Sequence, residues 1–162
     1  MVFLGSLGSY WDKTKRLEGL VRFLGEEAKL DRDLVSCAER AARLAKADLT
    51  THLVYEFPEL QGVAGSEYAK RDGENEAVSK AISGHYLPTN LTQDFRELEK
   101  QLNLEGVLVG LCDRIDLLMG AFLLEIELNA SQDPYALRRA AGGIVKILRA
   151  HPIHFSLARW MK

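Results

Sequence analysis

The chain has 162 residues, which is enough for one domain with a sizeable core. Its hydrophobic content of 47% and its charged content of 27% are typical of a soluble globular protein. The net charge of −2 argues against a protein whose main task is to grip nucleic-acid phosphates, because such proteins are usually basic.

Helical periodicity dominates the first third of the chain. Apolar residues at helical spacing over 17–28 predict a first helix with one buried stripe. Asp31 can cap a second helix, which we expect to continue through Asp48 to Tyr55. This helix should end before Pro58, because a residue that precedes proline disfavours the α region.

The middle of the chain predicts three further helical segments. Pro58 fits the first turn of a helix that ends near Gly73. A short helix is expected over residues 74–84, and Leu-Pro-Thr-Asn at 87–90 marks a break after it. Residues 92–102 then predict an exposed, charged helix.

Residues 104–124 are apolar on nearly all sides, which predicts the central helix of the fold. Glu105, Asp113, Arg114 and Asp116 lie within this stretch and argue against a membrane span, because charges at mid-bilayer are costly. We therefore expect no membrane partner.

A last long helix is predicted over residues 133–150, and a short C-terminal helix should follow Pro152. Ser131 or Asp133 can cap the long helix, and Pro134 fits its first position, where a missing N–H costs nothing. Together these elements predict an all-α orthogonal helical bundle.

Two cysteines, Cys37 and Cys112, fall on apolar-looking helical segments far apart in the chain. We interpret them as buried free thiols, which indicates a reducing compartment. Residues 1–5 lack the basic segment of a signal peptide, so the cytoplasm is the expected location.

Several short strings occur in a distinctive order along nearly the whole chain. They are Leu-Gly-Ser-Tyr-Trp-Asp-Lys at 7–13, Leu-Ala-Lys-Ala-Asp-Leu-Thr-Thr at 44–51, Glu-Phe-Pro-Glu-Leu-Gln-Gly at 56–62, His-Tyr-Leu-Pro at 85–88, Cys-Asp-Arg-Ile-Asp-Leu-Leu-Met-Gly at 112–120 and Asp-Pro-Tyr-Ala-Leu-Arg-Arg-Ala-Ala-Gly at 133–142. In this order they resemble the β subunit of the bacterial two-subunit glycyl-tRNA synthetase, a far longer chain. The resemblance implies that residues 1–162 form a single domain, a fragment from the middle of that subunit.

The resemblance also carries expectations about function. It implies a glycine–tRNA ligase of two α and two β subunits, which uses ATP to join glycine to tRNA(Gly). Activation chemistry would belong to the α subunit, while the β subunit would bind and position tRNA. We expect this domain to be a scaffold and a possible tRNA-contact module, with no catalysis, metal or cofactor of its own. Its partners would be tRNA(Gly), the α subunit and the rest of the β subunit.

The predicted order of helices, and the Asp-Arg-Ile-Asp element at 113–116, resemble a degenerate HD-domain fold. The HD metal-phosphohydrolases need a histidine on an early helix, an adjacent His–Asp pair on the next helix and a late aspartate. Here the expected pair reads Lys46-Ala47-Asp48, and the chain contains no His-Asp dipeptide. A cationic Lys46 would repel a divalent ion, so we favour loss of the metal.

A metal-dependent phosphohydrolase remains as an alternative. Asp48 and His52 are four residues apart and would share one face of a continuous helix, a spacing used by metal ligands. Asp113 or Asp116 could supply a third ligand, with a metal-bound water as nucleophile. The competing interpretation is that Asp48 and His52 pair with each other or with a neighbouring helix.

The carboxylates of Asp113 and Asp116 need partners if the central helix is buried. A structural ion-pair network with Arg138, Arg139 or Lys46 is favoured over contact with RNA. His85 is interpreted as a hydrogen-bonded packing histidine at a helix end.

Residues 57–62, Phe-Pro-Glu-Leu-Gln-Gly, predict a rigid buried corner in which the aromatic and leucine side chains point inward and the glycine allows close approach. An alternative places Glu59 and Gln61 against RNA or a partner subunit.

Basic residues that could meet a phosphate backbone fall in two sets. Six of them form the predicted tRNA-contact set: Arg138, Arg139, Lys146, Arg149, Lys70 and Arg71. Lys13, Lys15 and Arg16 on the first helix form a further group. A solvated helical face is the default interpretation, and a protein-interaction module without RNA contact is the remaining alternative class.

Overall fold

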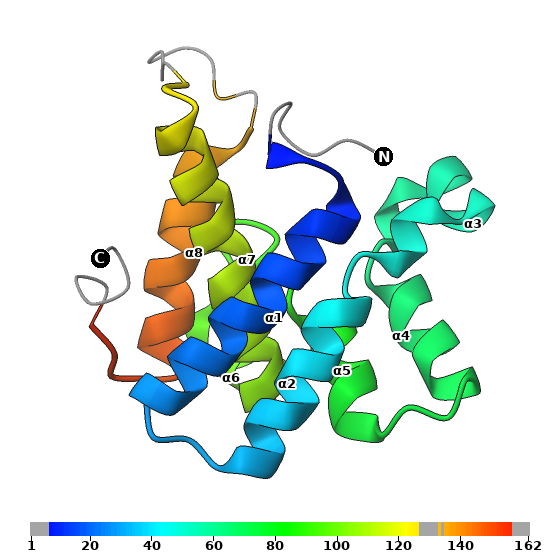
Figure 1. Cartoon of the computed structure of the whole chain (residues 1–162), viewed down its shortest axis with the longest axis horizontal. Helices are drawn as coiled ribbons and strands as arrows, with labels where there is room; N and C mark the ends of the chain where they lie inside the picture. The colour runs from blue at the N-terminus through cyan, green and yellow to red at the C-terminus, as the bar shows by residue number, and fades with distance from the viewer. Residues whose placement is uncertain (1–6, 127–132, 134, 157–162) are drawn as a thin grey trace.

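The computed structural model describes residues 7–126, 133 and 135–156, and within these ranges every regular element is a helix (Figure 1). The predicted all-α class is therefore confirmed. None of the described helices combines the length and the apolarity needed to cross a lipid bilayer.

The first two helices are α1 (Tyr10–Glu27) and α2 (Arg32–Leu44), which pack side by side (Figure 1). Ser9 begins α1 with a capping box, in which its side chain and that of Asp12 each accept a hydrogen bond from the other's backbone N–H. Asp31 caps α2, as predicted, by accepting from the N–H groups of the first turn.

The predicted extension of the second helix to Tyr55 is wrong. The chain instead forms a short 3₁₀ segment, η2 (Ala47–Thr50), and a separate helix, α3 (His52–Glu56). Thr51 is extended between them, with φ −89° and ψ 149°, and its hydroxyl caps α3 by accepting from the N–H of Val54. A capping threonine thus starts a new helix where periodicity alone suggested one continuous helix.

The predicted helix from Pro58 to Gly73 is also interrupted. Pro58 begins only a 3₁₀ turn, η3 (Pro58–Leu60), and α4 (Val63–Arg71) starts after Gly62. Gly62 has φ +82°, which L-residues rarely adopt, and a Cβ here would come within 2.5 Å of the Tyr86 ring. The predicted close approach of the glycine is confirmed, but the aromatic residue of this corner, Phe57, is 44% exposed and does not point inward.

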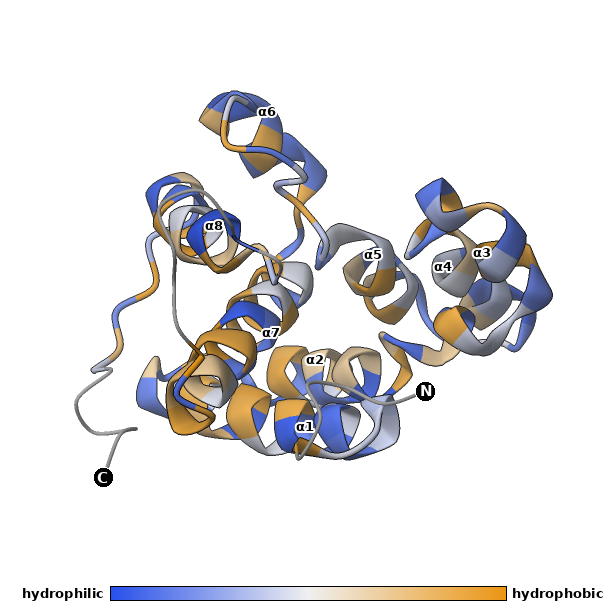
Figure 2. Ribbon diagram, turned by 90° about the horizontal axis from the view of Figure 1, so that it is seen from above, coloured by the Kyte–Doolittle hydropathy of each residue, from blue (hydrophilic) through white to orange (hydrophobic). Residues whose placement is uncertain are grey.

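The centre of the bundle is α7 (Leu104–Leu123), which is buried along most of its length. It contacts α1, α2, α5 (Glu76–Gly84) and α8 (Leu137–Ala150), so its predicted central position is confirmed (Figure 2). The charged helix α6 (Phe95–Gln101) is shorter than predicted, because Asp94 caps it.

Helix α8 (Leu137–Ala150) begins four residues later than predicted. Asp133 nevertheless acts as its cap, since its carboxylate accepts from the N–H groups of Leu137 and Arg138. The predicted roles of Ser131 and Pro134, and most of the expected C-terminal helix, lie outside the described residues. Cys112 is buried and Cys37 only partly so, and both are free thiols.

Candidate functional site: a cavity backed by buried charges

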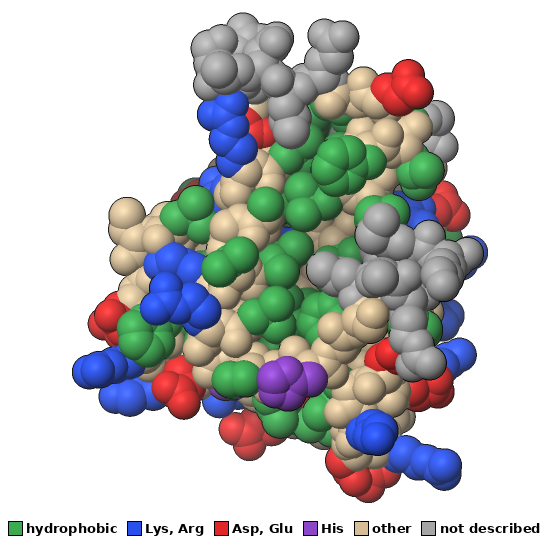
Figure 3. Space-filling view, turned by 90° about the vertical axis from the view of Figure 1, so that its left-hand side faces the viewer, with side chains coloured by type: hydrophobic (Ala, Val, Ile, Leu, Met, Phe, Trp, Pro, Cys, Tyr) green, Lys and Arg blue, Asp and Glu red, His purple; other side chains and the backbone are tan. Residues whose placement is uncertain are grey.

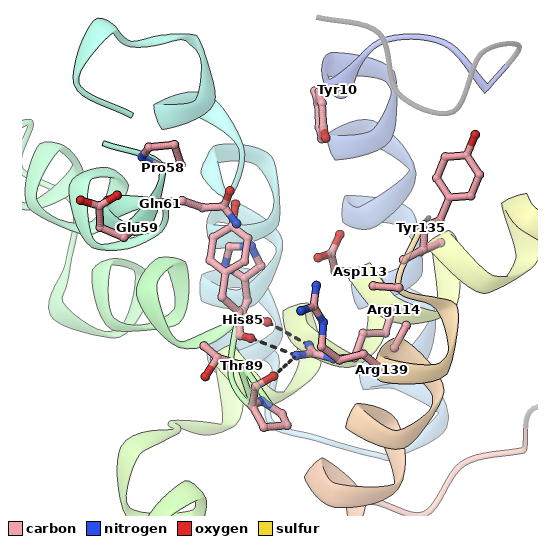
Figure 4. Close-up of a pocket in the computed structure, with 15 residues that line it drawn as sticks. Tyr10, Pro58, Glu59, Gln61, His85, Thr89, Asp113, Arg114, Tyr135 and Arg139 are labelled. Carbon is pink, nitrogen blue, oxygen red and sulfur yellow. Dashed lines mark hydrogen bonds between the residues drawn. The ribbon is translucent and has the colours of Figure 1, made fainter. Parts of the chain in front are cut away.

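A cavity of about 710 Å³ lies where α1, η3, α7 and α8 meet the turn after α5 (Figure 4). Its polar lining includes Glu59 and Gln61 from the η3 corner, His85 and Thr89 from the turn, and Asp113 from α7. Further lining side chains are Tyr10, Pro58, Tyr86, Pro88, Arg114, Leu117, Tyr135, Ala136, Arg139 and Ala140. The cavity therefore gathers residues from five of the six strings that the sequence analysis singled out.

The ammonium of Lys46 lies behind the His85 wall of this cavity. Its Nζ is 2.9 Å from Nε2 of His85 and 3.0 Å from Oδ2 of Asp113, and it sits 4.2 Å from the centre of the Tyr86 ring. Burial lowers the pKa of Lys46, and the nearby carboxylate of Asp113 opposes that shift. A cation is thus held by a histidine nitrogen, a carboxylate and an aromatic face.

The tautomer of His85 follows from its two neighbours. Its Nδ1 lies 2.6 Å from the carbonyl oxygen of Ile82, which can only accept, so Nδ1 carries the hydrogen. Nε2 must then accept from Lys46, and the ring is neutral. Burial, together with the charge of Lys46, lowers the pKa of His85 well below its usual value. The prediction of a hydrogen-bonded packing histidine at a helix end is confirmed.

A second buried ammonium, that of Lys13 on α1, bridges the two aspartates of α7. It lies 2.9 Å from Asp113 and 2.9 Å from Asp116, and Arg16 forms a two-pronged contact with Asp116. Burial raises the pKa of Asp113, but Lys46 and Lys13 outweigh it and hold that pKa well below the usual range. The predicted ion-pair network exists.

The partners in this network differ from those predicted. Lys46 takes part, whereas Arg138 and Arg139 form no ion pair with Asp113 or Asp116. Lys13 is buried, and the partly exposed Arg16 is held by Asp116 and by the Leu7 carbonyl, so both residues serve the fold and not a free basic face. The sequence held a signal for Lys13, because positions 13, 17, 21 and 24 lie on one helical stripe and the other three positions are apolar.

Arg114 is buried beneath the cavity without a carboxylate partner in hydrogen-bond contact. Its guanidinium donates instead to the backbone carbonyls of residues 85–88 and of Gly110 (Figure 4). The side chain passes so close to α8 that a Cβ on Gly143 would lie 2.6 Å from Nε. Arg114 therefore ties the turn after α5 to the centre of the bundle.

The predicted juxtaposition of Asp48 and His52 on one helix face is wrong. Asp48 is buried and accepts from the N–H groups of Gly62 and Gly65, which fixes the start of α4. His52 is exposed, beyond the break at Thr51. Within the described ranges, no three His, Cys, Asp or Glu side chains cluster as metal ligands.

The structure does not bring the six predicted tRNA-contact residues together. Lys70 and Arg71 end α4, on the opposite side of the bundle from α8 (Figure 1). On α8, Lys146 donates to the Gln93 carbonyl, while Arg149 stacks over Phe95 at 5.6 Å. Arg138 and Arg139 are exposed in the first turn, and Arg139 lines the cavity.

The described fold and cavity define an all-helical domain organised around a buried charge network. The family model described as "Glycyl-tRNA synthetase beta subunit" matches residues 1–162, and the chain belongs to this family. Similar proteins named glycine–tRNA ligase beta subunit include those of Moorella thermoacetica (46% identity over 97% of this chain), Myxococcus xanthus (43% over 98%) and Bacillus subtilis (40% over 91%). The chain spans only 21–22% of the length of these relatives.

Proposed function

We propose that this chain is a scaffold domain of a glycine–tRNA ligase β subunit, which contacts tRNA but catalyses no step itself. The observation that carries the proposal is the pair of buried ammonium groups. Lys46 and Lys13 occupy both oxygens of Asp113, and Lys46 also occupies Nε2 of His85. The groups best suited to acid–base or ligand chemistry are thereby committed to holding the fold.

We further propose that the fold is a degenerate HD domain. In this view the Lys46 ammonium takes the place of a bound cation. Its environment supports the idea, because an imidazole nitrogen and a carboxylate are also what a divalent metal would select. A fixed ammonium supplies the positive charge without a metal.

The properties of the whole enzyme belong to the same proposal. They are an assembly of two α and two β subunits, the use of ATP by that assembly, glycine transfer to tRNA(Gly) and a cytoplasmic location. The names of the relatives support tRNA as a partner of this chain.

Contact with tRNA is assigned primarily to the first turn of α8. Arg138 and Arg139 are exposed there, and lysine and arginine side chains lie at the margins of the partly apolar α8 side (Figure 3). Lys146 and Arg149 extend the same helix, although Lys146 contacts Gln93 just before α6 and Arg149 contacts Phe95, the first residue of α6. Lys70 and Arg71 form a separate, weaker candidate on α4, where Lys70 already pairs with Glu67 at 2.6 Å.

The test is the salt dependence of tRNA(Gly) binding by the assembled enzyme. Each phosphate contact that is lost lowers the slope of log K against log salt by about 0.7 to 0.9. We expect Arg138→Gln with Arg139→Gln to weaken binding and to reduce this slope by about one to two. Arg32→Gln, at an exposed position at the start of α2, serves as the control for the loss of a surface positive charge and should change neither quantity. Lys70→Gln with Arg71→Gln measures the α4 site separately.

Unchanged binding and slope in both the Arg138/Arg139 and the Lys70/Arg71 variants would argue for a domain that meets only protein partners.

A further inference from the structure

Among the described residues, the polar side chains of the cavity without a hydrogen-bond or ion-pair partner include Arg139 on α8, Gln61 at the η3 corner and Thr89 in the turn after α5 (Figure 4). These three come from separate walls. Glu59 and the buried hydroxyl of Tyr86 also lack such a partner.

The cavity also has an excess of positive charge on the α7–α8 side. The guanidinium of Arg114 is held by backbone carbonyls, so no hydrogen-bonded carboxylate neutralises it. Gly143 contacts Arg114, and Arg139 lies four residues before Gly143, on the same face of α8. The two guanidiniums therefore face the same space. The negative charge of Asp113 offsets little of the charge of these guanidiniums, because Lys13 and Lys46 already pair with its two oxygens.

The size and walls of the cavity suit an aromatic ligand rather than an inorganic anion alone. Its volume of about 710 Å³ falls within the range of about 300 to 1,000 Å³ that is usual for small-molecule sites. Tyr10 and Tyr135 line it with aromatic rings, and Tyr135 is 45% exposed at the rim. Unstacked RNA bases bind on such aromatic and arginine surfaces.

We infer that this cavity receives one unstacked nucleotide of the bound tRNA. Its phosphate pairs with Arg139, its base lies against the tyrosine-lined wall, and Gln61 and Thr89 meet the base or sugar edge. The inference rests on the proposed contact between α8 and tRNA. It goes further by placing a single nucleotide inside the molecule, where a purely electrostatic surface contact would leave every base outside.

The experiment fills the cavity without changing its charge. Thr89→Trp and Gln61→Trp each place an indole at an exposed position on a different wall. Thr50→Trp is the matched control, an exposed threonine that does not line the cavity. Base-selective chemical probing of tRNA(Gly) in complex with the assembled enzyme gives the protection of each nucleotide, and thermal melting verifies that each variant folds.

We expect at least one nucleotide to be protected by the unsubstituted enzyme and by Thr50→Trp, and to become reactive with both cavity-filling variants. The tRNA dissociation constant should rise about tenfold in those variants, as for the loss of one stacked base. The salt slope should fall by no more than about one, because displacing the nucleotide breaks only its single phosphate contact with Arg139. Footprints identical to the control in both cavity-filling variants would overturn the inference.

The same experiments distinguish failure of the nucleotide site from failure of the proposed surface contact between α8 and tRNA. If Arg138→Gln with Arg139→Gln alters the salt slope while the cavity-filled footprints match the control, the surface contact stands and the nucleotide site is refuted. If neither the charge variants nor the cavity-filling variants change binding or footprint, both proposals fall.

Discussion

The Lys46 ammonium donates a hydrogen bond to Nε2 of His85 at 2.9 Å, although both side chains are buried. Asp113 completes the contact at 3.0 Å, so one cation joins the segment after α2, the end of α5 and the central helix. Removing one member of such a group leaves the others buried without compensation.

Lys46→Met should therefore destabilise the domain strongly. The substitution preserves most of the side-chain volume but leaves His85 Nε2 and one oxygen of Asp113 without a donor. We expect a loss of about 3 kcal/mol in the free energy of unfolding, measured by urea denaturation. Lys80→Met, at an exposed position on α5, should change it by less than about 0.5 kcal/mol. Equal effects of the two substitutions would contradict a structural role for the Lys46 ammonium.

Asp113→Ala should be at least as damaging, because it strips two buried lysines of a carboxylate at once. A loss of about 3 to 5 kcal/mol is expected, with a clear drop in Tm. The comparison is Asp72→Ala, an exposed residue after α4. An unchanged melting temperature in Asp113→Ala would contradict a stabilising role for the ion-pair network.

The neutral state of His85 predicts a pH dependence of stability. Its pKa is lowered in the folded protein, so below about pH 6.5 the unfolded chain binds a proton that the folded chain refuses. The free energy of unfolding should fall with decreasing pH by about 1.4 kcal/mol per unit from this group alone. His85→Gln should flatten that slope between about pH 6.5 and 5, whereas His52→Gln, at an exposed position, should leave it intact. If the free energy of unfolding of His85→Gln depends on pH as steeply as that of the unsubstituted protein, His85 is not the group responsible.

Two glycines offer a test of the packing of Arg114. A Cβ at Gly143 would lie 2.6 Å from Arg114 Nε, and the backbone carbonyls that hold this guanidinium prevent it from moving aside. Gly143→Ala should therefore lower the free energy of unfolding by about 1 to 3 kcal/mol. At Gly19, on the exposed side of α1, a Cβ would meet nothing within 4 Å, so Gly19→Ala should stabilise by about 0.5 to 1 kcal/mol. Calorimetric melting that gave both substitutions the same sign would refute this packing.

The sequence predicted the all-helical class, the central helix and the starts of α2 and α7, because these depend on local spacing and on capping side chains. Helical periodicity missed the breaks at Thr51 and Gly62. The break at Thr51 has a local cause, the capping hydroxyl of Thr51, whereas the break at Gly62 depends on a contact between distant segments, the burial of Asp48 against the N–H groups of Gly62 and Gly65. The error in the proposed Asp48–His52 pair follows directly, since the pair required an unbroken helix.

The sequence also indicated some of the residues that line the cavity. The strings around residues 57–62, 85–88 and 133–142 were singled out separately, and the fold brings them to one place. Their convergence depends on tertiary packing, including the passage of Arg114 beside Gly143, which no local pattern encodes. The burial of Lys13 could have been predicted from its position on an apolar helical stripe. Its ion-pair partners on α7 could not have been predicted in this way.

The most direct test of the account is crosslinking of tRNA(Gly) to the full-length β chain in the assembled enzyme, followed by mapping of the modified peptides. The account predicts crosslinks within residues 137–150, the range of α8, and their loss when Arg138 and Arg139 are both replaced by glutamine. Crosslinks confined to peptides outside residues 1–162 would contradict it.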